Sequence, residues 1–269
     1  MNVLIADNEA LIRIGFFFCI FFLMALWEMI APRRPLRQSK IVRWFNNLAV
    51  TSLNTFIVSI IFPTAAVGIA IISEKQKWGI FNAASVPRYM AGIVTVVLLD
   101  LTIYAQHVCF HKIGIFWRLH RMHHTDLDID VTTGARFHPM EIILSMGIKM
   151  IVVLILGAPV WSVVVFEVLL NTTSMFNHGN VFLNEKIDSL LRVVVVTPDM
   201  HRVHHSVIIK ETDSNFGFNL SWWDRLFRTY RAQPASGHEA MIVGLANYRD
   251  RKWLTLPWML AIPFFERIR

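Results

Sequence analysis

Charged residues are scarce in this sequence. Asp, Glu, Lys and Arg together make up 17% of its 269 residues, whereas hydrophobic residues make up 55%. Soluble domains carry about 25% charged residues, so the composition argues against a soluble globular domain and favours a protein built for lipid. Cysteine is rarer still: Cys19 and Cys109 both lie in apolar segments and indicate no disulfide framework.

Acidic residues are outnumbered by basic ones, and the net charge is +7. The basic residues flank apolar segments and form no continuous stripe, so the charge predicts contact with anionic lipid headgroups and no nucleic-acid partner. The start of the chain lacks the charged segment and the small-residue cleavage site of a signal peptide. We therefore expect the first apolar segment to be retained as a helix.

Five apolar segments stand out, at about residues 11–30, 48–72, 89–111, 142–156 and 160–176. A spanning helix needs about 20 apolar residues, so the last two segments are short. Because only Gly157, Ala158 and Pro159 separate them, they form either a tight hairpin that spans a thin membrane or one that dips in and returns. The second segment contains Pro63, which membrane helices tolerate.

These segments predict an all-α integral membrane protein with four to five transmembrane or re-entrant helices and a cytoplasmic, histidine-rich helical cap. We expect N-terminal transmembrane helices and loops over residues 1–88. A histidine-rich domain should cover residues 89–232, including the 142–176 hairpin, and a C-terminal interfacial tail should cover residues 233–269. Within that tail, Trp253–Phe265 is the segment expected to lie at the membrane interface.

Charge asymmetry predicts the orientation. The stretch after the first segment holds five basic residues and no acidic one: Arg33, Arg34, Arg37, Lys40 and Arg43. Positively charged loops stay in the cytoplasm, and the next loop, with Lys75, Lys77 and Arg88 against Glu74, should lie outside. Counting segments from there puts every clustered histidine and the C-terminus on the cytoplasmic face. The expected location is a bacterial inner membrane, crossed several times.

Eight of the 11 histidines form three tight clusters: His107-Val-Cys-Phe-His111, His120-Arg-Met-His123-His124 and His201-Arg-Val-His204-His205. Helical residues three and four positions apart share a face, so each cluster can point its imidazoles into one cavity. His178 and His138 lie at the two cytoplasmic ends of the hairpin. The predicted metal ligands are therefore His107, His111, His120, His123, His124, His138, His178, His201, His204 and His205. So many imidazoles imply two ions, and imidazole suits iron, copper, nickel and zinc alike. His238 is expected to be solvated.

Several carboxylates could orient the imidazole rings by accepting their outer N–H groups. The candidates are Asp126, Asp128, Asp130, Asp199 and Asp213. For the first three, the alternative is a solvated acidic loop.

Asp100 shares a helical stripe with His107 and His111, and Tyr104 lies on the same side. A carboxylate inside a membrane is costly and usually functional. We therefore take Asp100 and Tyr104 as candidate catalytic residues, with Asp100 either holding a ligand or lining the substrate path. The alternative for Asp100 is a hydrogen bond that packs helices together.

Two features have structural interpretations. Ser221-Trp-Trp-Asp224 fits a helix capping box with interfacial tryptophans, and lining a lipid entrance is the alternative. Lys149 and Glu167 are the ionisable residues well inside the hairpin, at matching distances from its turn. Because a lone charge in lipid is costly, we predict that they form a salt bridge. The alternatives are a Lys149 that snorkels to the surface and a Glu167 that faces the metal cavity.

The three histidine clusters are accompanied by Arg136-Phe-His-Pro139, Phe176-Asn-His-Gly-Asn180, Thr197-Pro-Asp-Met200 and Asn215-Phe-Gly-Phe-Asn-Leu-Ser-Trp-Trp-Asp224. With these motifs the chain resembles the fatty acid hydroxylase/sterol desaturase superfamily from about Asp100 to Tyr230. The resemblance implies an integral-membrane enzyme with a non-haem di-iron centre that uses O₂ and two electrons. It implies nine ligands, the predicted set without His138. Some members have a further histidine four residues from the one matching His178, where this chain has Ser174 and Phe182, and His138 could replace it.

The expected activity is hydroxylation of a lipid C–H bond, in a sterol, a fatty acyl chain, an ether lipid or a carotenoid. Desaturation on the same centre is the alternative, as is a non-catalytic metal-binding membrane protein, and purified protein could carry zinc. No cytochrome b5-like domain is fused, so the resemblance implies an external electron donor of the ferredoxin, rubredoxin or cytochrome b5 type. A metal transporter would hold its ligands near the membrane midplane, which the clustering at one face argues against.

Overall fold

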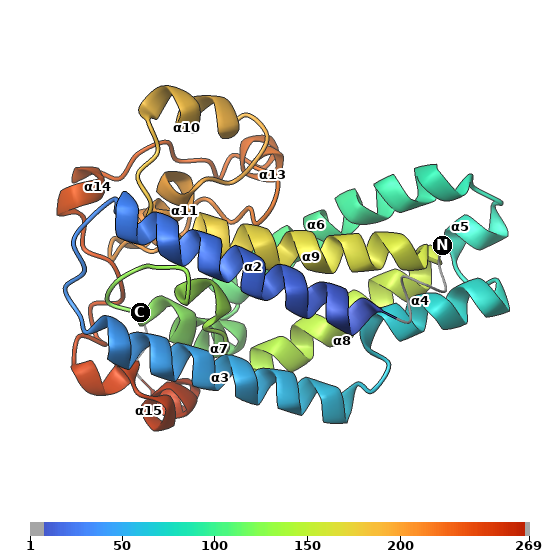
Figure 1. Cartoon of the computed structure of the whole chain (residues 1–269), viewed down its shortest axis with the longest axis horizontal. Helices are drawn as coiled ribbons and strands as arrows, with labels where there is room; N and C mark the ends of the chain where they lie inside the picture. Colours follow the sequence, from blue (N-terminus) through green and yellow to red (C-terminus); the bar gives the residue numbers. More distant parts are fainter. Residues whose placement is uncertain (1–7, 267–269) are drawn as a thin grey trace.

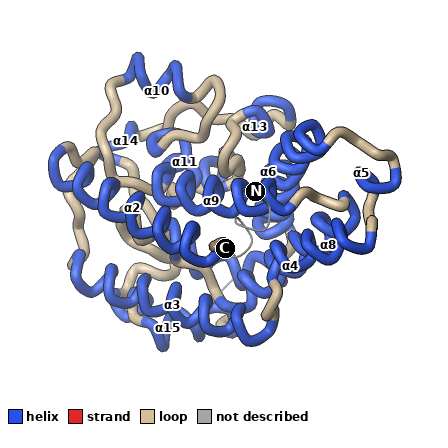
Figure 2. The backbone as a smooth tube through the Cα atoms, turned by 45° about the vertical axis from the view of Figure 1, so that its right-hand side comes forward, coloured by secondary structure: helices blue, strands red, loops and turns tan. Residues whose placement is uncertain are grey.

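The computed structural model describes residues 8–266. Over this range the chain is helical, with three isolated backbone bridges and no β-strand (Figure 2), which confirms the all-α prediction. The long helices lie side by side along the longest axis of the molecule, and short helices gather at one end of them (Figure 1). The long helices and their connections are α2 (Glu9–Ile30), α3 (Lys40–Ile61), α4 (Ala65–Gln76), α5 (Ile80–Ala83), α6 (Arg88–Lys112), α8 (Pro139–Leu156) and α9 (Val160–Asn177).

Five stretches of these helices are long and apolar enough to cross a membrane: Glu9–Ile30, Lys40–Ala83, Arg88–Lys112, Pro139–Leu156 and Val160–Asn177. Their outer faces carry exposed hydrophobic side chains, among them Phe22, Phe45 and Ile93, of which more than 60% is accessible. Such a continuous apolar surface is typical of a lipid-facing bundle. The chain is therefore an integral membrane protein, as its composition predicts.

The second stretch begins earlier than predicted and is not one helix. Helix α3 ends at Ile61 and α4 starts at Ala65, with Pro63 between them. Proline has no N–H to donate and disfavours helical geometry in the residue before it. Phe62, at φ −124° and ψ 71°, has left the helical region. The two helices nevertheless advance in the same general direction along the bundle (Figure 1).

Helices α8 and α9 form the predicted hairpin. Gly157 ends α8 with a left-handed φ of 66°, a conformation that glycine adopts without strain. Each arm has 18 residues, or about 27 Å at 1.5 Å per residue. This approaches the thickness of about 30 Å of a hydrocarbon core, so the hairpin is long enough to cross a membrane.

The short helices form a cap over the bundle end at which α6 and α9 terminate (Figure 1). They are α7 (Gly114–His124), η1 (Thr133–Ala135), α10 (Glu185–Leu191), α11 (Pro198–His204), α12 (Ile209–Thr212), α13 (Trp222–Leu226), α14 (Gly237–Ala240), η2 (Arg251–Leu254), α15 (Leu256–Ala261) and η3 (Ile262–Phe264). The last three place Trp253, Met259 and Ile262 in a buried cluster with Met122 of α7 and Val50 of α3. The segment expected at the interface therefore packs on the bundle, although Phe264 remains 72% exposed.

Candidate metal centre

Four elements bring the histidines together. His107 and His111 lie in the last two turns of α6, and the second cluster occupies the end of α7. His178 follows the last residue of α9, and the third cluster forms the end of α11. The short turn between α6 and α7 folds these two helices against each other, and α9 returns from the hairpin to the same place. Clusters that are distant in sequence thus share one buried volume.

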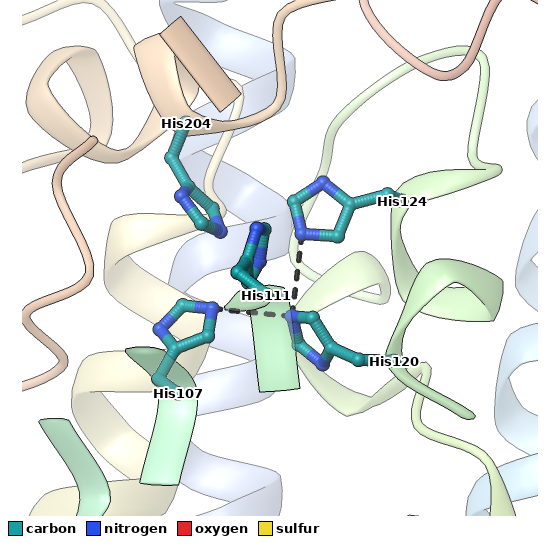
Figure 3. Close-up of side chains that lie close together, drawn as sticks. All are labelled: His107, His111, His120, His124 and His204. Carbon is teal, nitrogen blue, oxygen red and sulfur yellow. Dashed lines mark hydrogen bonds between the residues drawn. The ribbon is translucent and has the colours of Figure 1, made fainter. Parts of the chain in front are cut away.

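The structure gathers nine of the ten predicted ligands into two groups. The first, which we call the five-histidine group, contains His107, His111, His120, His124 and His204. The second, the four-histidine group, contains His123, His178, His201 and His205. Within each group one ring nitrogen per residue lies within 4.8 Å of those of the others, and every member is buried. Figure 3 shows the rings of the five-histidine group converging from their helices on a common centre.

The outer nitrogens of six rings are held by acceptors. Four Nδ1 atoms lie 2.7–3.1 Å from backbone carbonyl oxygens, in the pairs His107–Phe216, His123–Arg136, His178–Ser174 and His204–Ser214. Two more face carboxylates, in the pairs His111–Asp213 at 3.4 Å and His120–Glu141 at 2.7 Å. An acceptor at Nδ1 keeps the proton on that atom and leaves a lone pair on Nε2. The six rings are thereby fixed in the form that binds a metal.

The inner nitrogens face one another at short range. The Nε2 atom of His120 lies 3.1 Å from that of His107 and 3.2 Å from that of His124. In the other group, the Nε2 atom of His178 lies 3.1 Å from those of His123 and His201. In the His107–His120 and His123–His178 contacts both rings keep their protons on the outer nitrogen, so two Nε2 lone pairs face each other. A cation between them relieves this opposition, so the donor set fits metal ions.

Burial keeps these imidazoles neutral. It lowers the pKa of His178 to about 3, and the nearby rings of His107 and His120 lower it as well. Burial and the surrounding imidazoles also hold the pKa values of His123, His201 and His205 well below the usual 6.5. Neutral imidazole is the form that coordinates a metal, so the rings need no deprotonation at neutral pH.

The acidic run after α7 does not orient the histidines, and it is not a solvated loop. Asp126 accepts from Arg43 Nε at 2.7 Å, Asp130 accepts from Arg43 Nη1 at 2.5 Å, and both carboxylates are fully buried. Burial raises the pKa of Asp126, but the Arg43 guanidinium outweighs this and lowers it to about 2. Both interpretations were wrong because the sequence does not reveal that a buried arginine of α3 faces this loop. Asp128 instead accepts from two backbone N–H groups, of Arg37 and Gln38.

Of the remaining candidates, Asp213 contacts a clustered histidine, His111. Asp199 instead pairs with Arg33 and Arg202. The second carboxylate at the centre is Glu141, in the first turn of α8, which our sequence reasoning missed. Its sequence position three residues after His138 was the available signal, because residues three apart on a helix share a face.

Asp100 touches none of the histidines. Its carboxylate accepts from the backbone N–H groups of Asn219 and Leu220, at 3.2 and 3.1 Å, and from the indole of Trp223 at 2.8 Å. These bonds fasten the segment whose residue Phe216 supplies the carbonyl for His107. Tyr104 makes a hydrogen bond with the Thr229 hydroxyl at 2.9 Å. Both candidates thus make hydrogen bonds to the segment between residues 219 and 229, which lies beside the histidines.

The capping box expected at Ser221 is absent. Ser221 makes no side-chain cap and instead donates to the carbonyl oxygen of Arg192. Asp224 accepts from the backbone N–H groups of Phe216 and Gly217. The two polar side chains of this motif therefore bind backbone groups of neighbouring loop segments instead of capping a helix.

Two histidines lie apart from the groups. The Nδ1 atom of His138 accepts from the N–H of Met140 as the N-cap of α8, and its Nε2 donates to the carbonyl oxygen of Leu260. Both ring nitrogens are thus occupied. His238 is 5% exposed and lies 3.6 Å from Asp199, so the expectation that it is solvated was wrong.

A cavity of about 430 Å³ adjoins the five-histidine group. Helices α2, α3, α4, α6, α8 and α9 contribute to its wall, which includes His107, His120 and Glu141. None of the four-histidine group lines it. Apolar side chains such as Ile103, Phe137 and Phe218 form much of the remaining wall. The five-histidine group is therefore the one that faces a space large enough for part of a lipid.

Comparison with known proteins agrees with this arrangement. Residues 92–229, about half of the chain, match the family model described as fatty acid hydroxylase. The chain is 26% identical to the ornithine lipid hydroxylase OlsE of Rhizobium tropici over 79% of its own length and 65% of that protein. It is 25% identical to the alkylglycerol monooxygenase of Xenopus tropicalis over 84% of its length and 48% of that protein. The chain spans less than two thirds of the length of either relative. No solved structure matches. On the family match, which covers both the converging α6 and α7 histidines and the α11 cluster, this chain belongs to the fatty acid hydroxylase family.

Proposed function

We propose that this chain is a membrane-bound oxidoreductase that hydroxylates a C–H bond of a lipid with O₂, using two iron ions held by nine histidines. The observation that supports this most directly is the pair of histidine groups with opposed Nε2 atoms beside a cavity within the membrane helices. The two relatives named above are, by their names, a hydroxylase of ornithine lipid and a monooxygenase of alkylglycerol. The overall reaction consumes a C–H bond, O₂, two electrons and two protons, and yields an alcohol and water.

The five-histidine group would hold one ion and the four-histidine group the other. Iron bound there would supply the redox chemistry with O₂ that an unactivated C–H bond requires. The residues of this chain position the substrate and exclude water. Ile103, Phe137 and Phe218 form an apolar wall next to His107 and His120, so a carbon bound there lies in a site from which bulk water is displaced.

Two carboxylates support ligands of the five-histidine group, whereas in the four-histidine group only His123 and His178 have an acceptor at Nδ1, in each case a backbone carbonyl. A carboxylate behind an imidazole raises its basicity as a ligand. Glu141 and Asp213 thus make His120 and His111 stronger donors than the other seven. We assign the position that faces the substrate to the five-histidine group, because this group alone lines the cavity.

We further propose that the cap faces the cytoplasm. Three of the five arginines and lysines that predict this orientation have structural roles, because Arg34 and Arg43 are buried and Arg33 pairs with Asp199. Support comes instead from the exposed basic residues of the cap end: Lys112, Arg118, Lys210, Arg225, Arg251 and Lys252. Such an excess stays on the cytoplasmic side. This face would also meet the electron donor, a separate protein of the ferredoxin, rubredoxin or cytochrome b5 type.

The test is an assay of iron-loaded protein in nanodiscs with a lipid extract, O₂ and a chemical reductant, read by mass spectrometry. A product that carries one atom of ¹⁸O from ¹⁸O₂ is expected. An unlabelled, desaturated product would assign the chain to the desaturase alternative. Turnover without O₂, or an iron-loaded centre whose absorption spectrum is indifferent to O₂, would contradict oxygenase chemistry and leave a non-catalytic metal protein.

A further inference from the structure

The cavity beside the five-histidine group contains hydrogen-bond acceptors without donors. Two buried oxygen atoms of its wall, Glu141 Oε2 and Asn54 Oδ1, have no hydrogen-bond partner within the described chain. Glu141 is 4% exposed and Asn54 is 7% exposed. A buried acceptor that lacks a donor costs about 1–3 kcal/mol, so two of them in one cavity wall indicate a bound group that donates to them.

The orientation of both groups is set by their other contacts. Glu141 uses Oε1 to accept from Nδ1 of His120 at 2.7 Å, which leaves Oε2 for the cavity. Asn54 uses Nδ2 to donate to the carbonyl oxygen of Phe137 at 2.9 Å. Turning the amide over would place two oxygens against each other, so Oδ1 must face away from Phe137. Gln106 Oε1 also lacks a donor, but its amide can rotate to present N–H, so it adds nothing to the preference.

The threonine hydroxyls and the cations of the cavity wall are already used as donors. The hydroxyl groups of Thr51 and Thr55, which line the same cavity, donate to carbonyl oxygens of Asn47 and Thr51 within their own helix. At the far end of the cavity, Lys149 and Arg13 are cationic, but both lie against Glu167. The charged groups at the far end therefore pair with one another, and the two oxygens that lack a donor, on Glu141 and Asn54, lie at the histidine end.

We propose that the histidine end of this cavity binds a hydrogen-bond donor of the lipid, an ammonium or hydroxyl group, through Glu141 and Asn54. The carbon that is oxidised then belongs to a polar, donor-bearing part of the lipid and not to an unsubstituted alkyl chain. This inference rests on the proposed function for the identity of the reaction, but the binding preference itself does not require turnover. A volume of about 430 Å³ admits one such group and a short length of chain, not a whole two-chain lipid.

Binding is tested on the full chain in phosphatidylcholine nanodiscs, loaded with zinc so that no turnover occurs. The probes are dodecylammonium, 1-dodecanol and methyl dodecyl ether, which has the same chain but only an acceptor. Apparent affinities come from the rise in the unfolding midpoint with probe concentration. We expect at least one donor probe to bind about tenfold or more tightly than the ether, the effect of one hydrogen bond to a charged or buried acceptor. A stronger response to the ammonium identifies an amino lipid, and a stronger response to the alcohol identifies a hydroxylated lipid.

Variants locate the preference. Glu141→Gln keeps an oxygen for His120 but presents N–H to the cavity, so the preference for the donor should shrink about tenfold or reverse in favour of the ether. Asn54 contacts none of the histidines, and Asn54→Leu should also reduce the preference for the donor. This second variant keeps the test valid if Glu141→Gln loses its metal. Ser52→Ala, on the exposed face of α3 outside the cavity wall, is the control and should behave as wild type.

Equal affinity for all three probes in wild type would overturn the inference, since the acceptors would then be served by water. A preference that survives both Glu141→Gln and Asn54→Leu would overturn it as well. Failure of the ¹⁸O₂ experiment with the probe preference intact would instead count against the proposed reaction, so the two failures are distinguishable.

Discussion

The ammonium group of Lys149 on α8 donates to the carboxylate of Glu167 on α9, and both side chains are buried between the arms of the hairpin. This contact confirms the pairing predicted from their matching distances to the turn. Arg13 of α2 adds a second cation, 3.6 Å from the other carboxylate oxygen of Glu167. One glutamate thus joins three helices inside the membrane.

A double-mutant cycle should therefore show strong coupling within the hairpin. Lys149→Met and Glu167→Gln should each lower the free energy of unfolding, by about 3–5 kcal/mol, because each breaks the buried ion pair between the two helices. Glu167→Gln should cost more than Lys149→Met, since it removes the partner of Lys149 and also one of the two carboxylates beside Arg13, which keeps its ion pair with Glu9. The double variant should recover much of the lost stability. The free energies of unfolding are measured in bicelles. Strictly additive losses would show that the contact contributes nothing.

Metal content should follow the two histidine groups. Elemental mass spectrometry of the wild-type protein should find close to two metal ions per chain. His204→Ala and His205→Ala, neighbours in sequence but members of different groups, should each retain about one ion. His138→Ala is the control and should keep both, because His138 caps α8 outside the groups. A fully loaded, folded wild type with one ion would refute the two-metal assignment.

Reporter fusions should place the cap in the cytoplasm. A reporter fused to the C-terminus should be active only in its cytoplasmic form. One inserted between α5 and α6, at the opposite end of the bundle (Figure 1), should be active only in its exported form. Both reporters active on the same side would contradict the path of five crossings, and a simple exchange of the two results would invert the orientation.

Asp100 should prove to be a structural residue. Asp100→Asn should destabilise the protein by about 1–3 kcal/mol, because an amide cannot accept from all three donors of Asn219, Leu220 and Trp223. Tyr104→Phe, which loses one bond to Thr229, should cost about 0.5–1.5 kcal/mol. Thermal unfolding together with turnover separates the roles: an Asp100→Asn protein of normal stability but without activity would make Asp100 catalytic.

The fold class could be predicted because it depends on local properties. Hydrophobic runs and a tight Gly-Ala-Pro turn predict membrane helices and a hairpin wherever they occur. The prediction was less accurate at Pro63, where apolar character continues although the helix does not. Hydropathy reports burial in lipid, whereas helix continuity depends on backbone geometry.

The histidine groups were only partly predictable. Spacing within a helix shows which rings share a face, but it does not show which clusters meet. The five-histidine group takes members from α6, α7 and α11, whereas His123 of the second cluster and both His201 and His205 of the third belong to the other group. This division depends on how α11 packs on α9 and brings its histidine rings against those of α7, a long-range relationship that the spacing does not contain.

The amino-acid sequence by itself determined that the chain lies in a membrane, that its helices bring the histidine clusters to one end, and that Lys149 and Glu167 meet. Each of these follows from periodicity and hydropathy along single elements. Tertiary structure alone decided which carboxylates serve which partners. Asp126 and Asp130 pair with Arg43 of α3. Asp100 accepts hydrogen bonds from Trp223 and the backbone near it, and Glu141 accepts one from His120. The physical reason is that a buried polar group bonds to whatever the packing of distant segments places within about 3 Å.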